Sequence, residues 1–133
     1  MADYKTKDIS NIALLGNGSE GTTNLTEAML FAAGMIDRQG KVEAGTTVTD
    51  FDAEENKRGI SISAATAPVE WKGTKINLID VPGYFDFIGE MMGPLRGVET
   101  AAIVVGAVSG LTVGAEKAWA YAKKNNVCLM FIV

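Results

Sequence analysis

The feature that most constrains the fold of this chain is a glycine-rich turn at residues 16–23, which joins a short apolar run to a helical pattern. A strand, a tight glycine turn and a helix in this order are typical of α/β proteins. The turn resembles the phosphate-loop motif G-x-x-x-x-G-K-[ST], whose backbone N–H groups surround a phosphate, whose lysine neutralises it and whose last hydroxyl binds Mg²⁺. Gly16, Gly21 and Thr23 fit the motif, whereas Thr22 stands in the lysine position. Because such turns also occur in α/β proteins that bind no nucleotide, the loop alone leaves both interpretations open.

Short apolar runs rich in Ile, Val and Ala are typical of buried strands. They occupy residues 11–15, 60–65, 76–80, 101–108 and 127–133. Helical patterns cover residues 23–33 and 114–125, and a further helix should break near Gly93, because Pro94 follows it. Strands that alternate with helices predict a mostly parallel sheet with helices on both faces, and 133 residues suffice for one such domain or part of one.

Two further segments carry polar groups at expected strand ends. The apolar run of residues 76–80 ends in Asp80, and a turn with Pro82 and Gly83 follows it. An aspartate at a strand end is where a phosphate-loop protein holds its magnesium shell, and a glycine lets a backbone N–H approach a ligand closely. Between the glycine turn and this strand, Ser61 supplies a hydroxyl where a polar segment becomes apolar.

These segments together resemble the translational GTPases, most closely elongation factor G and its paralogues. The ordered matches are residues 11–14, 25–30, 58–62, 77–83 and 86–87. The resemblance implies a three-layer fold of the phosphate-loop NTPase type. It also implies that residues 1–133 are an incomplete GTP-binding domain, truncated on its C-terminal side. In the family this domain opens a much longer protein that works on the ribosome and hydrolyses GTP.

The resemblance also implies ligands and the residues that hold them. GTP or GDP would be bound by Gly16, Asn17, Gly18, Ser19, Glu20, Gly21, Thr22, Thr23, Asp80 and Gly83, and Mg²⁺ by Thr23, Ser61 and Asp80. Residues 34–59 would form the first switch and residues 81–93 the second. The alternative for residues 34–58 is a solvated acidic loop, which their lack of a period favours when no nucleotide is bound. We expect this loop to be mobile without ligand.

Tyr84 stands where many members of the family carry a histidine that positions the attacking water. A phenol can orient water, but with a reference pKa of about 10 it is a poor base near neutral pH. Tyr84 is therefore the candidate catalytic residue, in a role that its chemistry restricts.

Several departures from the family fall on its chemistry. Loss of the ammonium at Thr22 should cost about 3–5 kcal/mol of phosphate binding, which is about two to three decades of affinity. A carboxylate at Glu20, about 5 Å from a phosphate oxygen, would add roughly 3 kcal/mol of repulsion. Asn17 stands where histidine is frequent, and Gly106 where an aspartate often follows the strand. The alternative is therefore a nucleotide-independent pseudo-GTPase or interaction fragment, with no nucleotide bound.

The C-terminal residues carry further expectations. In the family the strand that resembles residues 128–133 leads into an Asn-Lys-x-Asp motif that recognises guanine, and the sequence stops before it. We expect an uncovered strand edge and apolar surface near Val133, through which two copies of the chain can associate. The single cysteine, Cys128, is expected to be a buried core thiol, and no intrachain disulfide is possible.

Composition excludes several classes of function. The net charge is −4, so no general basic field points to nucleic acid, and ribosome contact in the family comes largely from other regions. The chain begins with polar residues rather than a signal peptide, and its most apolar stretch is shorter than the roughly 20 residues of a membrane span. We expect a cytoplasmic protein with no membrane contact. The chain has no histidine that could act as a base or metal ligand.

Overall fold

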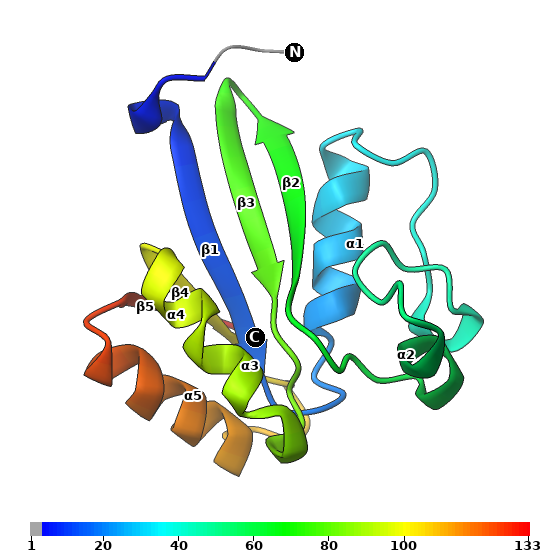
Figure 1. Cartoon of the computed structure of the whole chain (residues 1–133), viewed down its shortest axis with the longest axis vertical. Helices are drawn as coiled ribbons and strands as arrows, with labels where there is room; N and C mark the ends of the chain where they lie inside the picture. Colours follow the sequence, from blue (N-terminus) through cyan, green and yellow to red (C-terminus); the bar gives the residue numbers. More distant parts are fainter. Residues whose placement is uncertain (1–3) are drawn as a thin grey trace.

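The computed structural model describes residues 4–133, so the first three residues of the expected domain lie outside it. A five-stranded sheet in the order β2-β3-β1-β4-β5 forms its centre (Figure 1). The strands are β1 (Ile9–Gly16), β2 (Ala65–Trp71), β3 (Thr74–Asp80), β4 (Thr100–Val104) and β5 (Cys128–Ile132). β1 pairs in parallel with β3 and β4, β4 pairs in parallel with β5, and β2 alone is antiparallel. The predicted α/β fold with a mostly parallel sheet is confirmed.

Helices cover both faces of the sheet. They are α1 (Thr22–Ala32), α2 (Ala53–Arg58), α3 (Gly89–Met92), α4 (Pro94–Gly97) and α5 (Val113–Lys124), with short 3-10 turns at Thr6–Asp8, Val42–Ala44 and Phe85–Phe87. α1 packs against β1, β2 and β3, whereas α5 packs against β1, β4 and β5 on the opposite side (Figure 1). The result is the predicted three-layer arrangement. Among the described residues, no helix is long and apolar enough to cross a membrane.

Alternation along β1 divides the core into two clusters, because successive side chains of a strand point to opposite faces. Ala13 and Leu15 belong to the cluster under α3, α4 and α5, which also contains Leu95, Ile103 and Ala118. The second cluster, under α1, consists of Leu30, Ala67, Val69 and Leu78, with the partly buried Ile12 beside it. Both clusters fix β1, and β1 leads directly into the glycine turn.

Two predicted strands have different bounds. The expected strand at residues 60–65 is wrong, since β2 begins only at Ala65. The carboxylate of Glu55 accepts the backbone N–H groups of Ile62 and Ser63 instead, at 2.9 and 3.1 Å, so these groups are not available to a strand ladder. The expected strand at residues 101–108 ends at Val104.

The predicted helices at residues 23–33 and 114–125 are confirmed to within about one residue of α1 and α5. The predicted break is confirmed too, because Gly93 separates α3 from α4 and Pro94 opens α4. The sequence analysis missed α2. Its signal was the capping box formed by Asp52 and Glu55.

The prediction of a buried Cys128 is wrong, because this side chain is exposed. Cys128 lies on β5, an edge strand of the sheet. α1, the helix of one face, packs over β1, β2 and β3, and leaves Met130 of β5 45% exposed. β5 therefore reproduces the expected uncovered edge within the described residues, and Phe131 and Val133 are exposed there as well.

Candidate functional site

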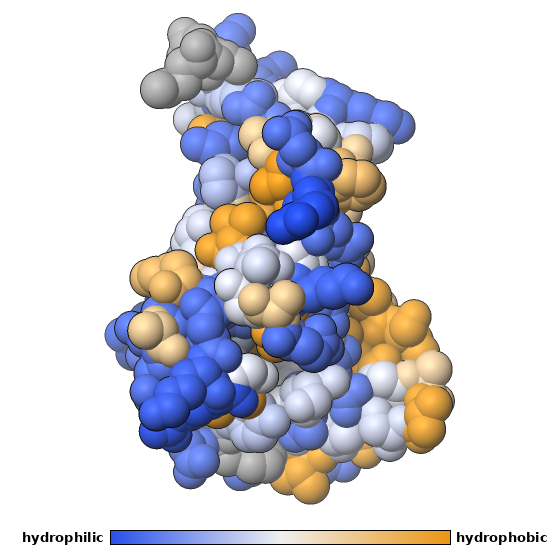
Figure 2. All heavy atoms as spheres, turned by 90° about the vertical axis from the view of Figure 1, so that its right-hand side faces the viewer, coloured by the Kyte–Doolittle hydropathy of each residue, from blue (hydrophilic) through white to orange (hydrophobic). Residues whose placement is uncertain are grey.

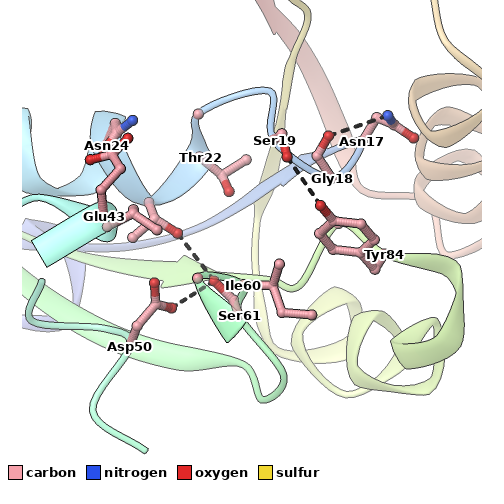
Figure 3. A pocket seen from close by; sticks show the side chains of 15 residues that line it. Asn17, Gly18, Ser19, Thr22, Asn24, Glu43, Asp50, Ile60, Ser61 and Tyr84 are labelled. Carbon is pink, nitrogen blue, oxygen red and sulfur yellow. Dashed lines mark hydrogen bonds between the residues drawn. The ribbon is translucent and has the colours of Figure 1, made fainter. Parts of the chain in front are cut away.

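A pocket lies where the glycine turn, the loop of residues 34–59 and the turn after β3 meet (Figure 3). Its volume is about 230 Å³. It is lined by Asn17, Gly18, Ser19, Gly21, Thr22, Thr23, Asn24, Val42, Glu43, Asp50, Gly59, Ile60, Ser61, Gly83 and Tyr84. β1 and β3 are parallel neighbours that both end here, and the C-terminal edge of a parallel sheet is the usual ligand site of α/β proteins.

Side-chain oxygens from three segments converge below this pocket. The Thr23 hydroxyl, at the start of α1, donates to Oδ2 of Asp80 at 2.7 Å, and the Thr49 hydroxyl donates to the same oxygen at 3.0 Å. The Ser61 hydroxyl donates to Oδ1 of Asp50 at 2.6 Å. Thr23 and Ser61 are themselves 3.2 Å apart, Oγ1 to Oγ. The structure thus brings Thr23, Ser61 and Asp80 together, and adds Thr49 and Asp50.

The hydroxyl groups of this oxygen cluster have too few protons to donate a hydrogen bond in every short oxygen–oxygen contact. Each hydroxyl carries one proton, and Thr23 and Ser61 direct theirs to Asp80 and Asp50. No proton is left for the Thr23–Ser61 contact when both carboxylates are ionised. In addition, Oδ1 of Asp80 is buried without a hydrogen-bond partner among the described residues. The cluster therefore has lone pairs to offer a cation or a proton.

Burial shifts the ionisation of both carboxyl groups. Desolvation raises the pKa of Asp80, and hydrogen bonds from the Thr23 and Thr49 hydroxyls oppose that rise. Desolvation also raises the pKa of Asp50, opposed by the hydrogen bond from Ser61 and supported by the negative charge of Glu55. A nearby positive charge would stabilise both carboxylates.

The donor set fits Mg²⁺ by its chemistry. Mg²⁺ prefers hard oxygen ligands and usually takes only one or two carboxylates from the protein. Thr23, Ser61 and Asp80 supply two hydroxyls and a carboxylate, and the unpartnered Oδ1 of Asp80 is the orphaned acceptor that a cation shell satisfies. No group of three or more Asp, Glu, Cys or His suited to a metal occurs in the part of the chain that the structure describes. The cluster therefore fits a cation whose remaining ligands come from water or phosphate.

The charges around the glycine turn of residues 16–23, which resembles a phosphate loop, are less favourable for binding an anion. Thr22 lines the pocket from the first position of α1, where the motif has lysine. None of the described residues that line the pocket is Lys or Arg, whereas Glu43 and Asp50 line it with carboxylates. An anion would meet backbone N–H groups and the start of α1, but no side-chain cation.

Glu20 lies elsewhere than the sequence analysis expected. Its carboxylate accepts a hydrogen bond from the Ser109 hydroxyl, at 2.9 Å to Oε1 and 3.0 Å to Oε2. Glu20 is absent from the pocket lining. The Glu20 carboxylate is thus directed to Ser109, and Glu43 is the glutamate that lines the pocket.

Tyr84 closes one side of the pocket. Its hydroxyl lies 3.1 Å from the Ser19 hydroxyl (Figure 3). Its ring lies against Gly18, where an added Cβ atom would be 2.8 Å from the ring carbons. Beside it, Gly83 touches the phosphate loop so closely that a Cβ atom would lie 2.7 Å from the carbonyl carbon of Asn17. The turn after β3 and the phosphate loop therefore form one packed unit.

A buried carboxylate, that of Glu27, anchors the loop of residues 34–59. Glu27 of α1 is fully buried and accepts the N–H groups of Gly40 and Val48 at 2.7 and 2.6 Å. The sequence analysis missed Glu27, because nothing in the spacing of the chain shows that a loop folds over this face of α1. The face that carries α1 and α2 is largely hydrophilic with separate hydrophobic patches (Figure 2), and Val48 and Phe51 are exposed apolar side chains of this loop.

Comparison with known proteins adds sequence similarity to this geometry. Residues 7–133 match the family described as Elongation factor Tu GTP binding domain. Elongation factor G 2 of Streptomyces coelicolor is 40% identical over 119 residues, which are 90% of this chain and 17% of that protein. The mitochondrial ribosome-releasing factor 2 of Saccharomyces cerevisiae is 36% identical over 124 residues, which are 92% of this chain and 15% of that protein.

A solved structure shows the same arrangement. A crystal structure of a protein from Thermus thermophilus superposes with a TM-score of 0.90 at 38% identity, and covers 92% of this chain and 19% of that one. The chain spans about a sixth of the length of the curated relatives named above.

Proposed function

Since the chain belongs to the family of the elongation factor Tu GTP-binding domain, as a member of the translational GTPases, we propose that it is the N-terminal part of the nucleotide-binding domain of an elongation factor G-like protein. The observation that carries this proposal is the convergence of Thr23, Ser61 and Asp80 at one end of the pocket. These three residues come from the phosphate loop, the segment that follows the first switch and the end of β3, and they are the residues that the family resemblance assigns to Mg²⁺.

The proposal gives each part of the pocket a role. Thr23, Ser61 and Asp80 hold Mg²⁺, which neutralises phosphate charge when a nucleotide is bound. The backbone of residues 16–23 holds the phosphates of GTP or GDP, aided by the N-terminus of α1. Gly83 senses the terminal phosphate, because its N–H lies in the turn packed against the phosphate loop. Residues 34–59 and 81–93 are the two switches.

Tyr84 is proposed to orient water rather than to act as a base. Its hydroxyl already lies within hydrogen-bond distance of Ser19, at the rim of the pocket. A phenol with a reference pKa of about 10 is rarely deprotonated near neutral pH. Hydrolysis by such a site should be slow.

Nucleotide binding is proposed to be weak, because the pocket lacks a side-chain cation. Thr22 replaces the lysine of the motif, and Glu43 adds a carboxylate to the lining. The negative lining makes the contribution of Mg²⁺ larger, since the metal is the main positive charge that can reach the phosphates.

For the intact protein we propose the ribosome as partner. The support is the sequence similarity to elongation factor G 2 and to the mitochondrial ribosome-releasing factor 2. The cytoplasm is proposed as its location from the sequence expectation alone, since the second of these relatives is mitochondrial. The described surface offers no obvious nucleic-acid site by charge, given a net charge of −4 for the chain.

The second candidate is a nucleotide-independent interaction domain. The observation that favours it is the hydrogen-bonded state of the oxygen cluster. Thr49 of the first switch donates to Asp80, and Asp50 of the same switch accepts from Ser61, which lies 3.2 Å from Thr23. Such a network holds the switch closed over the pocket without a nucleotide. This candidate predicts no change in the protein on addition of GTP.

A titration with fluorescent GDP and GTP analogues, with and without Mg²⁺, separates the two candidates. We expect binding weaker than micromolar that Mg²⁺ strengthens, and loss of the Mg²⁺ effect in Asp80→Asn. Asp37→Asn, an exposed site, is the matched control. Micromolar or tighter GTP binding by the parent chain would refute the proposal that this site binds nucleotide weakly. If the Thr22→Lys variant also showed no Mg²⁺-dependent binding, the nucleotide site would be wrong and the second candidate would stand.

A further inference from the structure

Two departures from the family pattern, far apart in the sequence, meet in one place. Glu20 lies in the phosphate loop, and Gly106 lies in the loop that follows β4. A Cβ atom built on Gly106 would lie within 2.3 Å of Oε2 of Glu20 and 2.5 Å from the Ser109 hydroxyl oxygen. The carboxylate of Glu20 therefore occupies the volume that a side chain at residue 106 would need.

Ser109 holds this carboxylate in place by a hydrogen bond. Its hydroxyl proton is shared between the two carboxylate oxygens of Glu20, with the backbone oxygen of Gly106 at 3.3 Å as a third neighbour. The turn that carries Ser109 is itself closed, because the Gly110 N–H donates to the Gly106 carbonyl at 2.9 Å. A hydrogen bond to a charged acceptor is stronger than a neutral one.

The phosphate loop needs such an anchor. The residues on either side of Glu20 both adopt positive φ, at 69° for Ser19 and 93° for Gly21. Positive φ is unfavourable for a serine, and contacts that hold the loop in this conformation offset the cost. Tyr84 holds the loop at Ser19, and among the described residues the other side-chain hydrogen bond from residues 18–21 to a distant segment is the one from Ser109 to Glu20.

We propose that Glu20 is a positioning residue, which fixes the phosphate loop to the loop of residues 106–110 and turns its own charge away from the pocket. Gly106 is the matching half of this contact, because only a residue without a side chain leaves room for the carboxylate. The inference rests on the contacts themselves and holds for either candidate function.

Reciprocal amide hydrogen exchange tests the proposal. The reporter amides are those of residue 20, which donates to the Asn17 carbonyl, and Gly110. Ser109→Ala should speed exchange at residue 20, in the other loop, and Glu20→Ala should speed exchange at Gly110, each by about tenfold if the contact has the usual strength. A purely local effect of either substitution would not cross from one loop to the other.

Further variants define the contact. Glu20→Gln keeps an accepting oxygen and should preserve most of the protection. In the double variant Glu20→Ala, Ser109→Ala, the exchange rates of the reporter amides should be no faster than in the single variants. Gly106→Ala should speed exchange at both reporters, and less so in the Glu20→Ala background. Gly97→Ala is the matched control, because nothing lies within 4 Å of the added Cβ atom there.

The Glu20–Ser109 contact is exposed, so these variants should fold, and their thermal melts provide the check. Unchanged exchange at Gly110 in Glu20→Ala would overturn the proposal. So would additive effects in the double variant, or a Gly106→Ala variant that behaves like Gly97→Ala.

Discussion

Replacing Thr22 by lysine should restore much of the missing phosphate affinity. Thr22 is the first residue of α1 and lines the open pocket, so an ammonium placed there reaches a bound phosphate. At an effective dielectric constant of about 20, a unit charge about 4 Å from a phosphate charge gains about 4 kcal/mol. Ordering a lysine side chain costs about 1.5–2 kcal/mol. The net gain of about 2–2.5 kcal/mol corresponds to roughly 30- to 60-fold in affinity.

The assay is the binding of fluorescent GDP with Mg²⁺, compared among three single variants. Thr22→Lys should bind about 30-fold or more tightly than the parent chain. Thr22→Met, of similar length without the charge, should bind like the parent. Thr74→Lys adds the same charge at the other end of β3 and should have little effect, because distant exposed charges are screened by salt.

The same assay shows which of two glutamates, Glu20 or Glu43, weakens nucleotide binding. In the Thr22→Lys background, Glu43→Gln should raise affinity further, since Glu43 lines the pocket, whereas Glu20→Gln should change it little. Equal binding by Thr22→Lys and Thr22→Met would refute the electrostatic reasoning. A larger gain from Glu20→Gln than from Glu43→Gln would show that Glu20 faces the phosphate after all.

Three other predictions concern stability, exchange and assembly. Hydrogen bonds from the backbone and side chain of Asn11 lower the pKa of Glu99 below its ordinary value of 4.5. The ionised carboxylate therefore stabilises the fold at neutral pH and loses this contribution as pH falls through the lowered pKa. Glu99→Gln should melt below the parent at pH 7 and approach it near pH 3, and a constant difference would contradict the assignment. Amides of residues 34–59 should exchange faster than those of the sheet core without ligand. Glu27→Gln should accelerate them further, because the amide keeps one accepting oxygen and replaces the other by an NH2 donor, so one of the N–H groups of Gly40 and Val48 loses its acceptor at a cost of about 1–3 kcal/mol. Protection unchanged by Glu27→Gln would mean that another contact holds the loop. Finally, the uncovered edge of β5 should produce dimers or larger species at micromolar concentration, and Phe131→Lys should reduce them; a strict monomer in light scattering would contradict this.

Local pattern was enough to predict the elements on which the site is built. Apolar runs and glycine turns located β1, β3 and β5, and helix signals located α1 and α5 to within about one residue. The order of the motifs predicted the α/β fold and the family. The same reasoning failed at residues 60–65, because strand formation there depends on which group takes the backbone N–H, and the carboxylate of Glu55 takes it.

What the sequence by itself determined was the residue set of the loop and the strand that leads into it, because the glycines, the hydroxyls and the apolar periodicity act over a few residues. Only the tertiary structure decided where the charges point. Glu20 turns to Ser109, 89 residues away, and Glu27 turns to the loop of residues 34–59. Asp50 and Thr49 join Thr23 and Asp80 because the long loop folds back over α1. Side-chain direction at such positions depends on partners that topology brings close, and the spacing of residues along one chain does not contain that information.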